Sequence, residues 1–114
     1  MPKLILVVEN DEAVRQLLVE AFTTEGYQPT EASNGNRALE LVKTVMFDLI
    51  TLDLEMPEMD GNQFLTELAK VSPAIPVLVI SSEPNKLKPH PQVKAVIAKP
   101  FNMEQVFVML EKYA

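Results

Sequence analysis

The chain has 114 residues, of which 47% are hydrophobic and 23% charged, a balance typical of a single folded domain, here residues 1–114. Sixteen acidic residues against ten basic ones give a net charge of −6, so the sequence offers no basic surface for binding nucleic acid. The absence of cysteine excludes disulfides and thiol chemistry, and no apolar run approaches the ~20 residues that span a bilayer, so we expect a cytoplasmic protein without membrane contact.

The chain begins with a buried strand followed by a helix. Leu4–Val8 is apolar at every position, as in a central strand of a parallel sheet. Asp11 is placed to cap the helix that follows, and Gly26 to end it. The helical period is carried by Val14, Leu17, Leu18, Ala21 and Phe22.

Two further strands and a helix follow. The more polar Gln28–Ala32 predicts an edge strand, and Asp48–Asp53 predicts a third strand that ends in an acid. Between them, one helical face is formed by Ala38, Leu41, Val42 and Val45.

The second half of the chain continues the alternation. Glu55–Gly61 is a loop because of its Pro and Gly, and a helix with Phe64, Leu65 and Leu68 follows it. Strands are predicted at Val77–Ser81 and Ala95–Ala98, and a last helix from Asn102 to Tyr113.

One helix is missing from this pattern, in the segment Ser82–Gln92. Three prolines interrupt it, and a proline inside a helix costs about 3 kcal/mol. At most one turn is expected, around Asn85–Lys88. His90 lies between two of these prolines and is interpreted as a solvated loop residue.

Alternating strands and helices predict an α/β protein with right-handed crossovers and a parallel sheet. Ligands of such sheets bind at the carboxyl ends of the strands. The polar residues expected at that edge are two carboxylates, an amide, a hydroxyl and an ammonium: Glu9, Asn10, Asp53, Ser81 and Lys99. Oxygen ligands suit Mg²⁺, and a carboxylate beside a metal, a hydroxyl and an ammonium suits formation of an aspartyl phosphate.

With these residues in view, the chain resembles the receiver domain of two-component response regulators. The resemblance is carried, in order along the chain, by Leu4–Glu12 with Arg15, Asp48–Gly61, Pro76–Ser82 and Lys99–Phe101. It implies a flavodoxin-like (βα)5 three-layer sandwich with a five-stranded parallel sheet of order 2-1-3-4-5. In this chain the fourth helix is replaced by the Pro-rich loop.

The resemblance also implies a role for each site residue. Asp53 matches the phosphoacceptor, Ser81 the hydroxyl that binds the phosphoryl group, and Lys99 the lysine that pairs with its oxygens. Pro100 matches the family's cis proline. The ligands implied for Mg²⁺ are Glu9, Asn10, Asp53 and the backbone carbonyl of Glu55. The implied phosphodonor is a phosphohistidine on a sensor histidine kinase or phosphotransfer protein.

Three departures from the family pattern bear on function. Asn10 replaces an acid, so Mg²⁺ affinity is expected to be lower by about tenfold or more. Val96 stands where the family has a switch aromatic, and the loop Ser82–Gln92 replaces a helix used for output. These departures favour an alternative function, a pseudo-receiver that binds proteins without phosphorylation.

A third alternative, an Asp-nucleophile hydrolase, rests only on the segment Leu52–Glu55 and ranks last because the chain has no room for a substrate cap. We therefore expect a signalling protein and not an enzyme.

The last helix carries more apolar residues than one buried face needs. All of Val106–Leu110 is apolar, so Val108 or Met109 is expected to meet a partner. The sequence predicts self-association, or docking of a partner, through Ser82–Gln92, the fifth strand and this helix.

Overall fold

In a computed structural model that describes residues 1–114, five parallel strands form one sheet of order β2-β1-β3-β4-β5. The strand order and the alternation of strands and helices confirm the predicted fold class. The elements are β1 (Leu4–Val8), α1 (Glu12–Thr24), β2 (Gln28–Ala32), α2 (Gly35–Val42), β3 (Leu49–Leu52), α3 (Gly61–Val71), β4 (Val77–Ser81), the single-turn 3-10 helix η1 (Pro84–Lys86), β5 (Val93–Ala98) and α4 (Met103–Tyr113).

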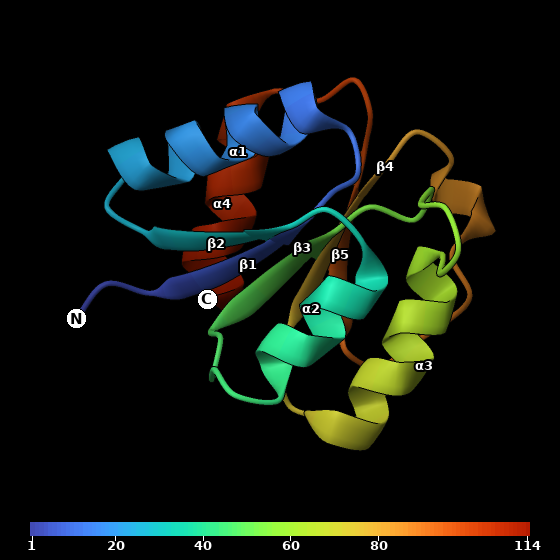
Figure 1. The fold of residues 1–114 in the computed structure, drawn as a ribbon. Coiled ribbons are helices and arrows are strands. Elements are labelled where there is room, and N and C mark those ends of the chain that lie inside the picture. The colour runs from blue at the N-terminus through green and yellow to red at the C-terminus, as the bar shows by residue number, and fades with distance from the viewer.

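The helices cover both faces of the sheet, as Figure 1 shows: α1 and α4 lie on one face, and α2 and α3 on the other. Each face holds its own hydrophobic core, and the largest buried side chains include Phe22 on the first face and Phe64 on the second. All residues of β3 and β4 are buried, as continuous apolar runs in a parallel sheet predict. None of the helices is long and apolar enough to cross a membrane.

Helix termini follow the predicted capping residues. Asp11 accepts a hydrogen bond from the Val14 amide, so it caps α1 and does not belong to the strand end before it. Gly26 follows α1 with a φ of 90°, a left-handed conformation that favours glycine. Asp60 and Gln63 form a reciprocal capping box at the start of α3.

Three predicted boundaries were wrong by a few residues. The third strand spans only Leu49–Leu52: the flanking Asp48 and Asp53 amides still donate to the Leu4 and Val8 carbonyls of β1, but neither residue has a paired partner across the sheet. The fifth strand begins at Val93, where an irregular register against β4 breaks the alternation that marks a strand in sequence. Helix α2 ends at Val42, and Val45 packs on the core from the loop after it.

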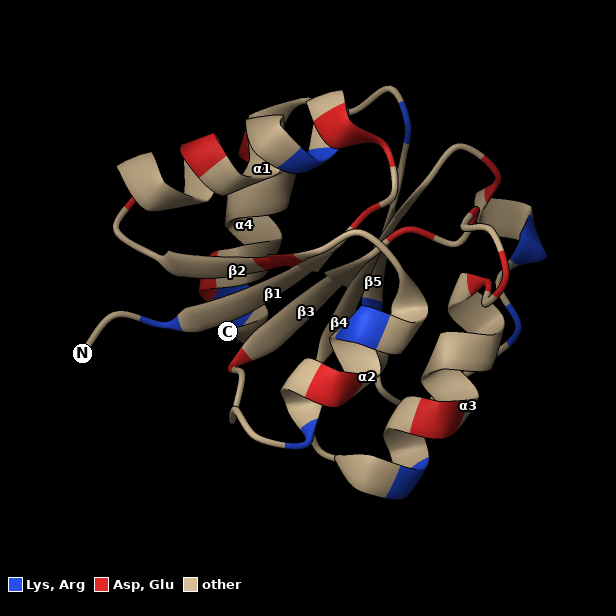
Figure 2. Ribbon diagram, in the orientation of Figure 1, with Lys and Arg blue, Asp and Glu red and all other residues tan.

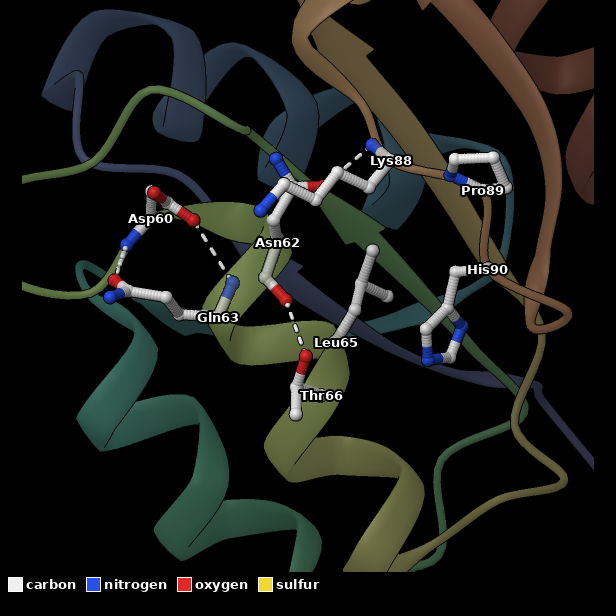
Figure 3. A pocket seen from close by; sticks show the side chains of 8 residues that line it. All are labelled: Asp60, Asn62, Gln63, Leu65, Thr66, Lys88, Pro89 and His90. Carbon is white, nitrogen blue, oxygen red and sulfur yellow. Dashed lines mark hydrogen bonds between the residues drawn. The ribbon is translucent and has the colours of Figure 1, made fainter.

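The Pro-rich segment forms only the single turn η1, as predicted, and one side chain of α3 holds it in place. The Asn62 amide donates to the Lys86 carbonyl at 2.9 Å and accepts from the Lys88 amide at 2.9 Å; Figure 3 draws the second of these hydrogen bonds. These contacts flank Leu87, which packs on the core cluster of the α2–α3 face. β4 is buried along its whole length, whereas Val96 on the neighbouring strand β5 is 43% exposed.

The start of α3 also positions the segment that follows β3. The Gly61 amide donates to the Leu54 carbonyl at 2.9 Å. A Cβ at Gly61 would lie 2.8 Å from the Leu54 Cα and 3.0 Å from the Asp53 carbonyl oxygen, closer than such contacts allow. The absence of a side chain at this position therefore lets α3 pack directly against the backbone that carries Asp53.

We expect Gly61→Ala to lower the free energy of unfolding by about 1–3 kcal/mol, because the obstructing atoms belong to the backbone and cannot turn aside. The matched control is Gly35→Ala, whose Cβ would meet only the flexible side chain of Met59 and should change stability little. Urea denaturation of both variants and the wild type measures this. Equal losses in the two variants would contradict it.

Candidate functional site

The predicted polar residues lie together at the carboxyl edge of the sheet. β1 leads into Glu9 and Asn10, β3 into Asp53 and Glu55, and β4 ends at Ser81. Figure 2 shows acidic positions gathered on the segments just after β1 and β3. Neighbouring parallel strands end at the same edge, so residues more than forty positions apart in sequence become neighbours.

The Lys99 ammonium links two buried carboxylates at the centre of this site. It donates to Glu9 Oε1 at 2.8 Å and lies 3.7 Å from Asp53 Oδ1. Glu9 and Asp53 are only 2% and 3% exposed. The Lys99–Pro100 peptide is cis, as the resemblance implies.

The backbone and a neighbouring arginine fix the position of Glu9. Its Oε2 accepts from the Asp11 amide at 3.1 Å, and Arg15 donates to its carbonyl oxygen at 2.9 Å. Arg15 also pairs with Glu31 at 2.9 Å. Each carboxylate oxygen of Glu9 thus has a protein partner, and one of them holds Lys99 near Asp53.

The Asn10 side chain faces Asp53 from the opposite side. With its nitrogen turned inward, the amide donates to Asp53 Oδ2 at 2.8 Å and to the Glu55 carbonyl oxygen at 3.0 Å. This orientation is assigned from the hydrogen-bond network, because only a donor is compatible with two acceptors. The amide therefore supplies partial positive charge to a pocket rich in carboxylates.

A second set of contacts joins the loop after β3 to the end of β4. The Ser81 hydroxyl contacts both carboxylate oxygens of Glu55, at 2.7 and 2.9 Å, and the Ser82 hydroxyl lies 3.2 Å from one of them. The Ser81 oxygen also accepts from the Glu83 amide at 2.9 Å. Asp53 Oδ1 accepts from the Glu55 amide at 3.1 Å, so the two acids are linked through the backbone as well.

Sequence reasoning missed two participants in these contacts. Only the carbonyl of Glu55 was assigned a role at the site, and Ser82, which follows Ser81 at the same strand end, was assigned none. The alternation of a strand would point Ser82 away from Ser81, but β4 ends at Ser81 and the alternation ends with it. Two adjacent serines after an apolar strand are the only signal in the sequence.

Burial and charge shift the pKa of the central groups. Burial raises the pKa of Asp53 above its ordinary value, and the nearby Glu9 and Glu55 carboxyl groups raise it further. The Lys99 ammonium acts in the opposite direction and lowers the pKa of Asp53, because a nearby positive charge favours the ionised form. Burial alone would raise the pKa of Glu55, but hydrogen bonding with Asp53, Ser81 and Ser82 lowers it to about 2.

The donors around Asn10 fit a hard cation in kind. The Asp53 carboxylate, the Glu55 carbonyl and the Asn10 amide meet at one point, and a half-turn of the amide would place its oxygen there. Oxygen donors of these types are those that Mg²⁺ prefers. No cluster of three or more His, Cys, Asp or Glu side chains forms a metal site in the chain, so a cation here would have few charged ligands.

A separate apolar groove of about 420 Å³ runs between β5 and α4. Its apolar lining comes from Ala95, Val96 and Ile97 on β5 and from Val108 and Met109 on α4. Val108 is 56% exposed, while Met109 packs against the core on the α1–α4 face. Of the two residues expected to meet a partner, Val108 is the exposed one.

Comparisons with known proteins agree with this geometry. A family model for the response regulator receiver domain matches residues 5–111. Sporulation initiation phosphotransferase F of Bacillus subtilis is 32% identical, with 99% of this chain and 94% of the relative covered. Chemotaxis protein CheY of Thermotoga maritima is 32% identical, with 98% of both chains covered.

A solved structure also resembles the chain along its whole length. The response regulator TrrA of Thermotoga maritima, in complex with Mg²⁺ and BeF, superposes with a TM-score of 0.88 at 28% identity. The match covers 98% of this chain and 99% of that one.

We expect Asn10→Asp to bind Mg²⁺ about tenfold more tightly or better, because a hard cation gains a charged ligand. Without metal, the same change should lower the free energy of unfolding by about 1–2 kcal/mol, since two hydrogen bonds are replaced by repulsion from Asp53. Mg²⁺ titration and denaturation with and without MgCl₂ measure both effects. Asn36→Asp adds the same charge at an exposed position of α2 and serves as the control. Unchanged Mg²⁺ affinity would show that Asn10 does not ligate the metal.

Proposed function

The chain belongs to the response regulator receiver family of two-component signalling, and we propose that residues 1–114 form one receiver domain that accepts a phosphoryl group on Asp53. The donor is the phosphohistidine of a sensor histidine kinase or phosphotransfer protein. The signal passes onward through protein contacts.

The observation that carries this proposal is the setting of the Asp53 carboxylate. It is buried at a strand end, lies 3.7 Å from the Lys99 ammonium, and has the Ser81 hydroxyl on the neighbouring strand. A nucleophile, a fixed positive charge and a hydroxyl donor at one edge of a sheet are the groups that phosphoryl transfer to a carboxylate needs.

In the proposed transfer, one oxygen of the Asp53 carboxylate forms a bond to phosphorus while the P–N bond to the donor imidazole breaks. The imidazole leaves with the electron pair of that bond. Lys99, held by Glu9, offsets the negative charge on the phosphoryl oxygens. Mg²⁺ held by Glu9, Asn10, Asp53 and the Glu55 carbonyl would add positive charge at the same oxygens when bound.

Acetyl phosphate and Mg²⁺ should add the mass of one phosphoryl group to the wild-type protein, and Asp53→Ala should abolish the adduct. Asp48→Ala removes an acid at the opposite end of β3 and should keep the adduct. Intact-mass spectrometry measures all three proteins. An unchanged wild-type mass at saturating donor would overturn the proposal and favour the pseudo-receiver, which the uncharged Asn10 side chain supports.

The groove between β5 and α4 supports a second proposal, a docking surface for another copy of the chain. Val96 and Val108 lie exposed on the two elements that line the groove. A closed two-fold dimer is the geometry that pairs the groove with itself.

We expect the wild type to sediment as a dimer at ~100 μM and Val108→Glu to sediment as a monomer, because a buried unpaired carboxylate opposes association. Val71→Glu is the matched control, since Val71 is 41% exposed but lies at the end of α3, outside the groove. A wild type that is monomeric at this concentration would contradict the dimer.

A further inference from the structure

The Ser81 hydroxyl has no free hydrogen in this structure. A serine hydroxyl carries one hydrogen and can donate only one hydrogen bond at full strength. Ser81 directs that hydrogen at the Glu55 carboxylate, whose two oxygens lie 2.7 and 2.9 Å away, and its oxygen accepts from the Glu83 amide. Since Ser81 is fully buried, water offers it no alternative partner.

Resting on the proposed function, we propose that the Glu55 carboxylate gates phosphorylation by holding the Ser81 hydroxyl until a phosphoryl group on Asp53 displaces it. A phosphoryl oxygen and the Glu55 carboxylate need the same hydrogen of Ser81, so one acceptor must leave before the other binds. Glu55 is thus a positioning residue that acts through Ser81.

The charges in the pocket favour this exchange once the phosphoryl group arrives. The Lys99 ammonium faces Glu9 and Asp53, and the Glu55 carboxylate, bound to Ser81, is a third acid at the same site. A phosphoryl group adds further negative charge next to Glu55, whose side chain is half-buried and has a path to solvent. Repulsion therefore drives the Glu55 side chain outward while Ser81 stays in the pocket.

The gate is also connected to the loop that replaces the fourth helix. The Ser82 hydroxyl shares the Glu55 carboxylate at 3.2 Å, and the Glu83 amide donates to the Ser81 oxygen. When the Glu55 side chain moves outward, its contact with Ser82 must break, whereas the Glu83 amide can keep its bond to the Ser81 oxygen. Phosphorylation of Asp53 would thereby reach this loop through Glu55.

A substitution at Glu55 tests the contribution of its side chain separately from the contributions of its backbone carbonyl and amide. The carbonyl oxygen that faces Asn10 and the amide that donates to Asp53 remain in any variant. We expect Glu55→Ala to be phosphorylated by acetyl phosphate and Mg²⁺ about tenfold faster than the wild type, the size of one charge-assisted hydrogen bond removed. Glu55→Gln keeps an oxygen acceptor and should show a smaller increase.

The control for charge alone is Glu58→Ala, which removes an acid from the same loop but has no hydrogen bond to either serine. It should react within about twofold of the wild type, since its charge is exposed and screened. Combining Glu55→Ala with Ser81→Ala tests whether Glu55 acts through Ser81. The double variant should react at nearly the same rate as Ser81→Ala alone. Initial rates of adduct formation come from time-resolved intact mass.

Two outcomes would overturn the gate. Equal rates for Glu55→Ala and Glu58→Ala would show that any effect comes from net charge alone. Equal acceleration by Glu55→Ala with and without Ser81 would show that Glu55 does not act through Ser81. Both outcomes require an adduct on Asp53. If no protein in the series gains a phosphoryl group, the proposed function fails, and that result is distinct from failure of the gate.

Discussion

The ammonium of Lys99 is the charge on which the rest of the site depends. It lies between the buried carboxylates of Glu9 and Asp53, and a third carboxylate, that of Glu55, closes the pocket. Three acids around one base would repel one another strongly at low dielectric. The folded chain reduces that repulsion with neutral donors, the Asn10 amide and the Ser81 hydroxyl. The Asn10 amide occupies the Asp53 carboxylate, and the Glu55 carboxylate occupies the Ser81 hydroxyl, so two groups that the proposed chemistry requires are engaged before it begins.

The crowding of carboxylates at this site also explains what an uncharged amide at Asn10 contributes. A fourth acid at this position would need a cation to remain stable, whereas the amide satisfies Asp53 and the Glu55 carbonyl without one. A metal at this site would compete with the amide nitrogen for the same two oxygens. In the absence of a metal, the amide keeps both oxygens hydrogen-bonded.

Most of the fold could be predicted because buried parallel strands are continuous apolar runs and because parallel strands end at a common edge. The same rule predicted that Glu9, Asp53, Ser81 and Lys99 lie together at that edge. The side-chain role of Glu55 could not be predicted, since periodicity does not describe which way a loop residue turns. The start of β5 was missed for a related reason: its irregular register against β4 leaves no alternating pattern.

Where the family has a fourth helix, two hydrogen bonds of the Asn62 side chain help to hold the segment Ser82–Gln92 against the sheet. The local stability of such a segment differs from that of a helix. A helix is held by a ladder of its own hydrogen bonds, whereas the middle of this segment is held by two bonds to one side chain and by the packing of Leu87. Its ends are anchored separately, by the Glu83 amide on Ser81 and by the buried Gln92 side chain on the Ser72 and Ile75 carbonyls. We therefore expect the middle of the segment to open at a lower free energy than global unfolding, while its ends and the sheet stay in place. The Lys88 amide is then a natural reporter, because its exchange with solvent deuterium would follow this local opening and not the unfolding of the domain.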